Sequence, residues 1–105
     1  MNITIQTLGF TAKHKLTGFV YEKLERLSHF YDKIISSEVC FRLDKSDTKE
    51  NKVCDLRLGI PGNDLLASAQ CKTFEEATVQ SVEILERLIK KRKTKLNVIR
   101  KYRIN

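Results

Sequence analysis

The residues with the clearest potential for chemistry are the lysines and arginines within residues 86–105. This segment contains nine basic residues and a single acid, Glu86. Residues 1–85 hold eleven basic and twelve acidic side chains and so carry about −1, which means that the segment, at +8, supplies all of the net charge of +7. A dense positive field attracts polyanions, because each phosphate that Lys or Arg neutralises releases a condensed counterion. The charge distribution therefore favours nucleic acid as the partner.

Two other interpretations of this charge are open. Lys and Arg in the last turns of a helix complement its dipole and keep it soluble, which accounts for two or three such residues but not for nine. An anionic membrane would also attract the segment, but residues 97–105 are too short and too weakly apolar for a stable interfacial anchor. No stretch approaches the roughly 18 apolar residues that a membrane span needs. A membrane-surface or protein-binding adaptor is the weaker alternative.

The sequence contains no recognisable catalytic constellation. It has no phosphate-binding glycine loop, no G-x-S-x-G and no cluster of His and Cys at metal-binding spacing. Glu75 and Glu76 are a pair of acids, but the first turn of a helix favours carboxylates through its dipole and its cap. Cys40, Cys54 and Cys71 form no C-x-x-C pair and are typical of reduced cytoplasmic thiols. We expect no enzymatic activity, cofactor, metal or small-molecule substrate.

Hydrophobic periodicity predicts the first elements that position the cations. Residues 2–8 alternate between apolar and polar, as in a half-buried strand. Residues 13–31 change to helical spacing, and we expect this helix to begin through Thr11. The stripe on its buried face consists of Leu16, Val20, Leu24, Leu27 and Tyr31.

The second half of the chain predicts a meander of strands followed by a helix. Residues 39–43 and 56–60 alternate and are separated by the polar stretch 44–51. Pro61 and Gly62 suit the central positions of a type II turn, and a strand through residues 65–69 follows. Thr73 and Glu76 form a capping box that begins the second helix. The buried stripe of that helix is expected to contain Phe74, Thr78, Ser81, Val82, Leu85, Leu88 and Ile89.

The order β-α-β-β-β-α predicts an α+β domain. Its two helices pack on one face of a four-stranded, mainly antiparallel sheet. Residues 1–96 form this domain, and residues 97–105 form a basic, flexible tail. Strand parity places Cys54 and Cys71 in the core, and Cys40 with Arg42 on the other face of the sheet. We expect a free monomer in the cytoplasm.

Helical geometry arranges the cations of the second helix. With Leu85 set to zero at the centre of the buried stripe, Arg87, Lys91 and Lys95 fall at about 200°, 240° and 280°. They form one continuous row on the outer and lateral side of the helix. Lys90 lies at the opposite margin.

The first helix carries Lys23 and Arg26 on one flank of its buried stripe, at about 300° and 240° from Val20. If the two helices lie side by side over the sheet, these two cations and the row of the second helix border the same groove. Such a groove suits a phosphate backbone better than scattered surface charge does.

Several segments, taken in order, resemble one known family. They are MNITIQ at the start, Phe19-Val20 followed by Lys23-Leu24-x-Arg26-Leu27, Phe30-Tyr31-Asp32-Lys33-Ile34, Pro61-Gly62-x-Asp64-Leu65, Ala67-x-Ala69, and Leu85-x-Arg87-x-Ile89-x-Lys91-x-Lys93. The chain thereby resembles the ribosome hibernation promoting factors, also described as ribosome-associated inhibitors or sigma 54 modulation proteins. The resemblance extends from residue 1 to about residue 96 without an evident gap.

The resemblance implies a non-enzymatic factor that binds the small ribosomal subunit and its rRNA in the mRNA/tRNA channel. Occupying this channel inhibits translation by steric exclusion. The family's basic positions match Lys23, Arg26, Lys33, Arg87, Lys91 and Lys95, and Lys90 and Arg92 of the same segment complete the predicted nucleic-acid-binding set. Ile84 departs from the pattern, because relatives often carry Lys there.

Two points stay open at this stage. The chain ends before the second, dimer-forming domain of the longer family members, so we expect no direct ribosome pairing through such a domain, and pairing assisted by another factor stays open. A general double-stranded RNA-binding module, which can combine a sheet and two helices in a similar shape, is the alternative function.

Overall fold

The computed structural model describes residues 2–45 and 49–103, and from residue 93 onward it describes the backbone alone. The elements, in order, are β1 (Asn2–Thr7), α1 (His14–Phe30), β2 (Ser36–Leu43), β3 (Lys52–Ile60), β4 (Asn63–Cys71) and α2 (Phe74–Arg103). The predicted β-α-β-β-β-α order is therefore confirmed. The middle of the predicted polar loop, residues 46–48, lies outside the described residues.

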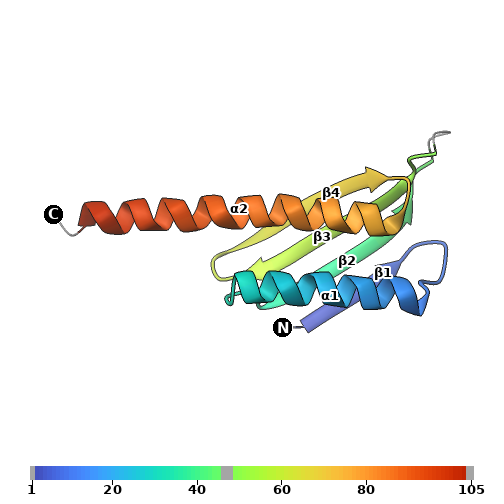
Figure 1. The fold of residues 1–105 in the computed structure, drawn as a ribbon, viewed down its shortest axis with the longest axis horizontal. Helices are drawn as coiled ribbons and strands as arrows, with labels where there is room; N and C mark the ends of the chain where they lie inside the picture. The colour runs from blue at the N-terminus through green and yellow to red at the C-terminus, as the bar shows by residue number, and fades with distance from the viewer. Residues whose placement is uncertain (1, 46–48, 104–105) are drawn as a thin grey trace.

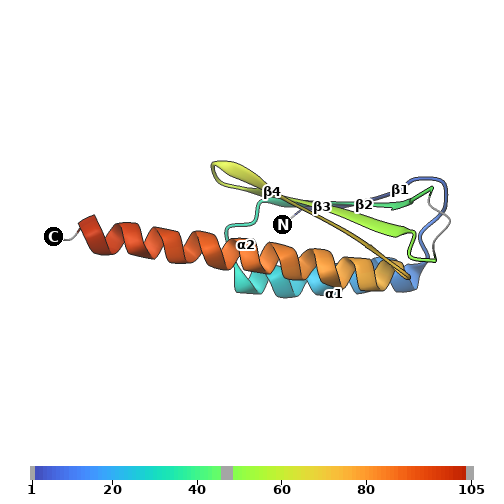
Figure 2. The same cartoon turned by 90° about the horizontal axis from the view of Figure 1, so that it is seen from above.

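The four strands form one sheet in the order β1-β2-β3-β4 (Figure 1). β1 runs parallel to β2, since α1 carries the chain back across the sheet between them. The other neighbouring pairs are antiparallel and are connected directly along the chain. Both helices lie on the same face of the sheet (Figure 2), so the opposite face carries no helix.

The start of α1 differs from the prediction. Lys13 occupies the N-cap position without a side-chain hydrogen bond, and the helix begins at His14, so entry through Thr11 was wrong. The packing of the preceding loop explains the shift. Gly9 adopts φ +85°, and the Phe10 ring then stacks on Phe74 with 4.7 Å between ring centroids. The chain must complete this apolar contact before it can turn into the helix.

The structure contains the predicted type II turn and the Thr73 hydrogen bond of the predicted capping box. Ile60 pairs with Asn63 across a two-residue turn, and Gly62 adopts φ +85°, as the third residue of a type II turn requires. At the start of α2, the Thr73 hydroxyl oxygen accepts a hydrogen bond from the Glu76 backbone N–H at 3.1 Å. This bond satisfies one of the free N–H groups of the first turn.

The core lies between the sheet and the two helices. Val20, Leu85 and Phe41 have no exposed surface and represent α1, α2 and the sheet in it. Ala77 is also fully buried, although the predicted stripe of α2 did not include it. α2 contributes two buried hydroxyls that are satisfied by hydrogen bonds, since Thr78 and Ser81 donate to backbone carbonyl oxygens.

The cysteines lie where strand parity predicted. Cys54 and Cys71 are buried in the core, whereas Cys40 is half-buried on the other face of the sheet. Burial raises the pKa of the Cys54 thiol to about 11, so this thiol is protonated at neutral pH.

Within the described residues, neither helix is long and apolar enough to cross a membrane.

Candidate nucleic-acid interface

Two of the predicted cations lie on one flank of α1. Lys23 is half-buried and holds its ammonium 5.3 Å from the centre of the Phe19 ring, whereas Arg26 is exposed. A lysine over an aromatic ring is attracted to its negative face, which restricts the ammonium to one region without neutralising its charge. The flank therefore presents one cation that is supported by an aromatic ring and one that is exposed to solvent.

A contact between the helices shows where this flank faces. The Lys90 ammonium of α2 lies 5.7 Å from the centre of the Phe30 ring of α1. Phe30 falls at about 280° from Val20, between Arg26 and Lys23, so all three side chains share one flank. Lys90 of α2 and the two cations of α1 therefore border the same junction between the helices.

Arg87 and Lys91 of the predicted α2 row turn away from this junction. Arg87 and Lys91 are both exposed, at about 60° and 100° around the helix from Lys90. The predicted common groove is therefore changed in one respect: its α2 border is Lys90, whereas Arg87 and Lys91 continue over the outer side of α2. The Lys95 side chain lies outside the described residues.

The last two predicted residues occupy different surroundings. Lys33 is exposed in the connection between α1 and β2. Arg92 is half-buried, and its Nη2 donates a hydrogen bond to the Pro61 backbone oxygen at 2.9 Å. Sequence reasoning missed this contact, although a position seven residues after Leu85 returns to about −20° and thus to the buried side of α2.

Ion pairs among the described residues gather on the uncovered face of the sheet. Arg42 pairs with Asp55 at 2.9 Å, and Arg57 pairs with Asp64. Burial opposes ionisation of Asp55, but hydrogen bonds from Ser68 and Arg42 outweigh it and lower the pKa of this carboxyl. The hydrogen bond between Arg42 and Asp55 also raises the pKa of Arg42. Neither pair includes a cation of the helical face.

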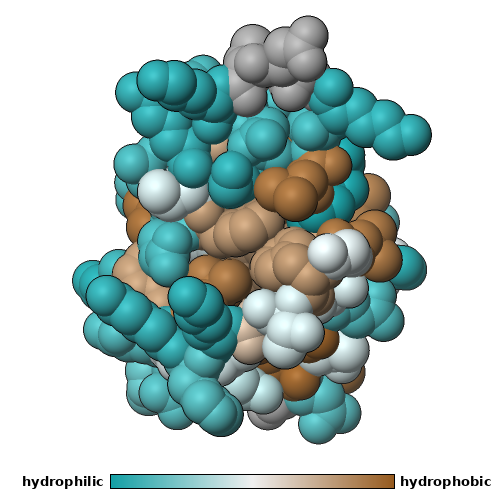
Figure 3. All heavy atoms as spheres, turned by 90° about the vertical axis from the view of Figure 1, so that its right-hand side faces the viewer, coloured by the Kyte–Doolittle hydropathy of each residue, from teal (hydrophilic) through white to brown (hydrophobic). Residues whose placement is uncertain are grey.

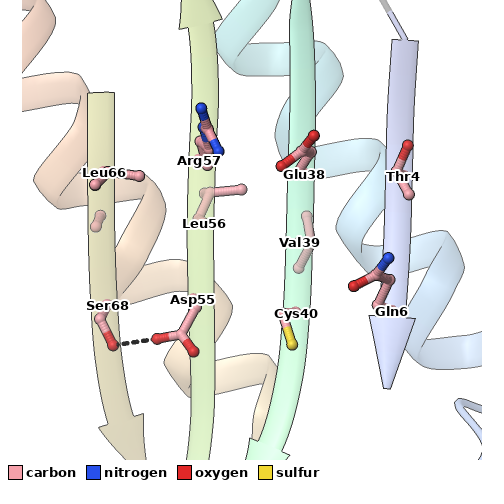
Figure 4. Close-up of a pocket in the computed structure, with 11 residues that line it drawn as sticks. Thr4, Gln6, Glu38, Val39, Cys40, Asp55, Leu56, Arg57, Leu66 and Ser68 are labelled. Atoms are coloured by element: carbon pink, nitrogen blue, oxygen red, sulfur yellow. Dashed lines mark hydrogen bonds between the residues drawn. The ribbon is translucent and has the colours of Figure 1, made fainter. Parts of the chain in front are cut away.

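A shallow concavity of about 580 Å³ also lies on the uncovered face (Figure 4). Thr4 and Glu38 line one part of it, and Cys40, Asp55 and Ser68 line another. The hydrogen bond that Ser68 donates to Asp55, 2.6 Å long, crosses from β4 to β3 within it. Within the described residues there is no group of three or more His, Cys, Asp or Glu side chains placed to hold a metal ion.

Apolar surface gathers at the end of the molecule where β1 and β2 finish. Leu8 and Leu43 are 56% and 47% exposed there. Figure 3 shows that hydrophilic side chains surround and divide the apolar surface at this end. The C-terminal half of α2 points toward the opposite end of the molecule (Figure 1). The apolar end and the basic half of α2 are therefore separate surfaces.

Residues 3–97 match a family model described as sigma 54 modulation protein / S30EA ribosomal protein. The chain belongs to this family. A curated relative, the ribosome hibernation promoting factor of Pseudomonas putida, is 28% identical over 95 residues, which are 90% of this chain and 89% of the relative. The resemblance inferred from the sequence segments is thus confirmed.

Two solved structures have the same fold as this family member. A ribosomal subunit interface protein from Coxiella burnetii superposes with a TM-score of 0.79 at 22% identity, over 90% of this chain and 99% of that one. The N-terminal domain of Protein Y from Thermus thermophilus gives 0.74 at 20% identity, over 87% and 98%. Membership of the sigma 54 modulation / S30EA family supports a ribosome-associated function in the regulation of translation.

Proposed function

We propose that this protein is a ribosome hibernation factor that binds the small ribosomal subunit in its mRNA/tRNA channel and inhibits translation by steric exclusion. The observation that carries the proposal is the segregation of charge. The helical face presents exposed cations such as Arg26, Arg87 and Lys91, whereas the ion pairs described for this chain lie on the opposite face. Cations that no carboxylate occupies are available to phosphate.

In this proposal the protein acts by binding alone, without catalysis or a cofactor. Phosphate contacts supply most of the affinity, and they carry little sequence information. Site selection therefore comes from the fit of a rigid domain against folded rRNA. The proposed phosphate contacts are Lys23, Arg26, Lys33, Arg87, Lys90, Lys91 and Lys95. Arg92 belongs to the same basic segment, but its guanidinium donates to the Pro61 backbone oxygen.

The two aromatic contacts support this role. Lys23 over Phe19 and Lys90 over Phe30 are held on rings before any RNA is present. Restricting a long side chain in advance lowers the entropy that binding costs. The ammonium groups keep their charge and their N–H donors, so they remain able to contact phosphate. The junction between the helices is accordingly a prepared binding surface.

A competition experiment tests the proposal. Purified protein is bound to small ribosomal subunits, and then initiator tRNA with mRNA, or a free RNA duplex, is added as competitor. We expect tRNA and mRNA to displace the protein and the duplex to have little effect, because only the former occupy the same channel. Displacement by duplex alone would instead indicate a general double-stranded RNA-binding module, and no binding to subunits at low salt would refute the proposal.

The proposal also assigns a state and a location. A factor that acts on idle ribosomes works in the cytoplasm, and we propose that the free protein is a monomer. Sedimentation of cell extract through a sucrose gradient, with detection of this chain, measures its association with ribosomal particles and the size of its free form. We expect one population with small subunits or whole ribosomes and the remainder at the position of a 12.2 kDa monomer.

A further inference from the structure

Arg92 differs from the basic residues beside it. Lys90 and Lys91 are exposed, but Arg92 is half-buried and donates from Nη2 to the Pro61 backbone oxygen at 2.9 Å. It lies two helical turns after Leu85 and on the same side of α2. Ile89 is the last fully buried side chain among the described side chains of α2, which end at Arg92. Arg92 thus attaches α2 to the body about one helical turn after Ile89.

The acceptor of this hydrogen bond belongs to a fixed turn. The strands are paired up to Ile60 and Asn63, and Ile60 is buried. Pro61 has a restricted φ, and Gly62 supplies the positive φ that completes the turn. A Cβ added to Gly62 would lie 3.7 Å from Arg92 Nη2, so the guanidinium packs closely against the turn. The Pro61 carbonyl is therefore a well-placed anchor.

A small tilt of α2 near this anchor would move the end of the helix by several ångströms. The helix continues past the β3–β4 turn as far as Arg103 (Figure 1). Residues 93–103 extend for about 16 Å at 1.5 Å per residue, and a tilt of about 10° at Arg92 moves the far end by roughly 3 Å. A displacement of this size equals the length of a hydrogen bond. A small change in the direction of α2 near Arg92 would therefore be large enough to alter the contacts of its basic half.

We propose that Arg92 is a positioning residue, which fixes the direction of the basic half of α2 through its hydrogen bond to Pro61 and contributes little direct phosphate binding. This inference rests on the proposed function, because the direction of α2 matters to a partner that reads a rigid surface. It separates Arg92 from Lys91, its neighbour of equal charge. Lys91 contacts phosphate, and Arg92 holds the helix that carries the contact.

The salt dependence of binding separates the two roles. The dissociation constant for small ribosomal subunits is measured at several KCl concentrations for the wild type, Arg92→Gln and the matched variant Lys91→Gln. We expect Lys91→Gln to lower the slope of log K against log[salt] by about 0.7–0.9, the value for one lost phosphate contact. We expect Arg92→Gln to weaken binding about two- to tenfold with the slope unchanged, because a helix that is held less firmly must be ordered when it binds. An equal fall in slope for both variants, or wild-type affinity of Arg92→Gln, would overturn the proposal.

A measurement without ribosomes tests the anchor separately. Residual dipolar couplings of backbone amides report the direction of residues 93–103 relative to the sheet in the free protein. We expect Arg92→Gln to change or average these couplings and Lys91→Gln to leave them as in the wild type. Unchanged couplings in Arg92→Gln would overturn the anchor. Absence of subunit binding by the wild type would refute the proposed function, and the couplings would still decide the role of Arg92 in the fold.

Discussion

The two faces of the sheet use their cations in opposite ways. On the uncovered face, Arg42 and Arg57 are paired with Asp55 and Asp64 across neighbouring strands. On the helical face, Lys23 and Lys90 lie over aromatic rings, and these contacts leave their charge uncompensated. A carboxylate beside a guanidinium compensates its charge and thereby weakens its attraction for phosphate. An ammonium on a ring retains its donors, so the same charge serves the fold on one face and binding on the other.

This comparison makes position more informative than net charge. The chain has a net charge of +7, but a uniform distribution of that charge would attract RNA without selecting a surface. Here the exposed cations of the proposed interface lie on the helices and in the connection after α1, whereas the carboxylates that pair with arginine lie on the uncovered face of the sheet. The difference between the faces should therefore appear directly in substitutions that remove equal charge from different places.

The largest effect is expected from removing the outer row of α2. The triple variant Arg87→Gln, Lys91→Gln and Lys95→Gln loses three charges at about 1 kcal/mol each, so binding to small subunits should fall by about a hundredfold or more. Its melting temperature should change little, because Arg87 and Lys91 are exposed. Subunit pelleting and thermal unfolding measure the two quantities.

A matched variant tests whether position or total charge causes this loss. Lys45, Lys49 and Lys72 are exposed near the end where the β2–β3 loop lies, away from the basic half of α2. Changing these three lysines to Gln removes the same charge. We expect only the weak loss that long-range attraction explains. Equal losses in the two triple variants would remove the distinction between the surfaces.

A smaller effect is expected when the aromatic supports are removed and every charge is kept. In the double variant Phe19→Leu and Phe30→Leu, Lys23 and Lys90 lose their rings. Each exposed cation–π contact contributes about 0.5–1 kcal/mol, so affinity should fall several-fold with an unchanged salt slope. Phe10→Leu serves as the control, since its ring stacks on Phe74 rather than under a lysine. An unchanged affinity of the double variant would show that these rings do not prepare the lysines.

Local sequence predicted the parts of this arrangement that depend on one element. The helical period of 3.6 residues places Arg87 and Lys91 on the exposed side of α2. The alternation of a strand places Cys40 and Cys54 on different faces of the sheet, and the structure shows both arrangements. Thr73 and Gly62 were recognised because capping and a positive φ need only neighbouring residues.

Contacts between distant elements were not predictable in this way. The proximity of Lys90 to Phe30 depends on which flank of α1 faces α2, and the bond from Arg92 to Pro61 depends on where the β3–β4 hairpin ends beside α2. Lys13 rather than Thr11 caps α1 because Phe10 must first reach Phe74. Each of these outcomes is set by tertiary packing, which propensity and spacing do not contain.

The smallest effect is expected on the uncovered face, where Asp55→Asn breaks the pair with Arg42. The two side chains are 38% and 41% exposed, so the loss of stability at pH 7 should be below about 1 kcal/mol. The pKa of Asp55 is lowered by folding, so its contribution is present above the unfolded pKa of about 3.9 and is lost as the pH falls through the folded value. The wild type should therefore lose its advantage over Asp55→Asn below about pH 4 in urea unfolding. Subunit binding at neutral pH should equal that of the wild type, and a clear loss of binding would mean that RNA contacts both faces.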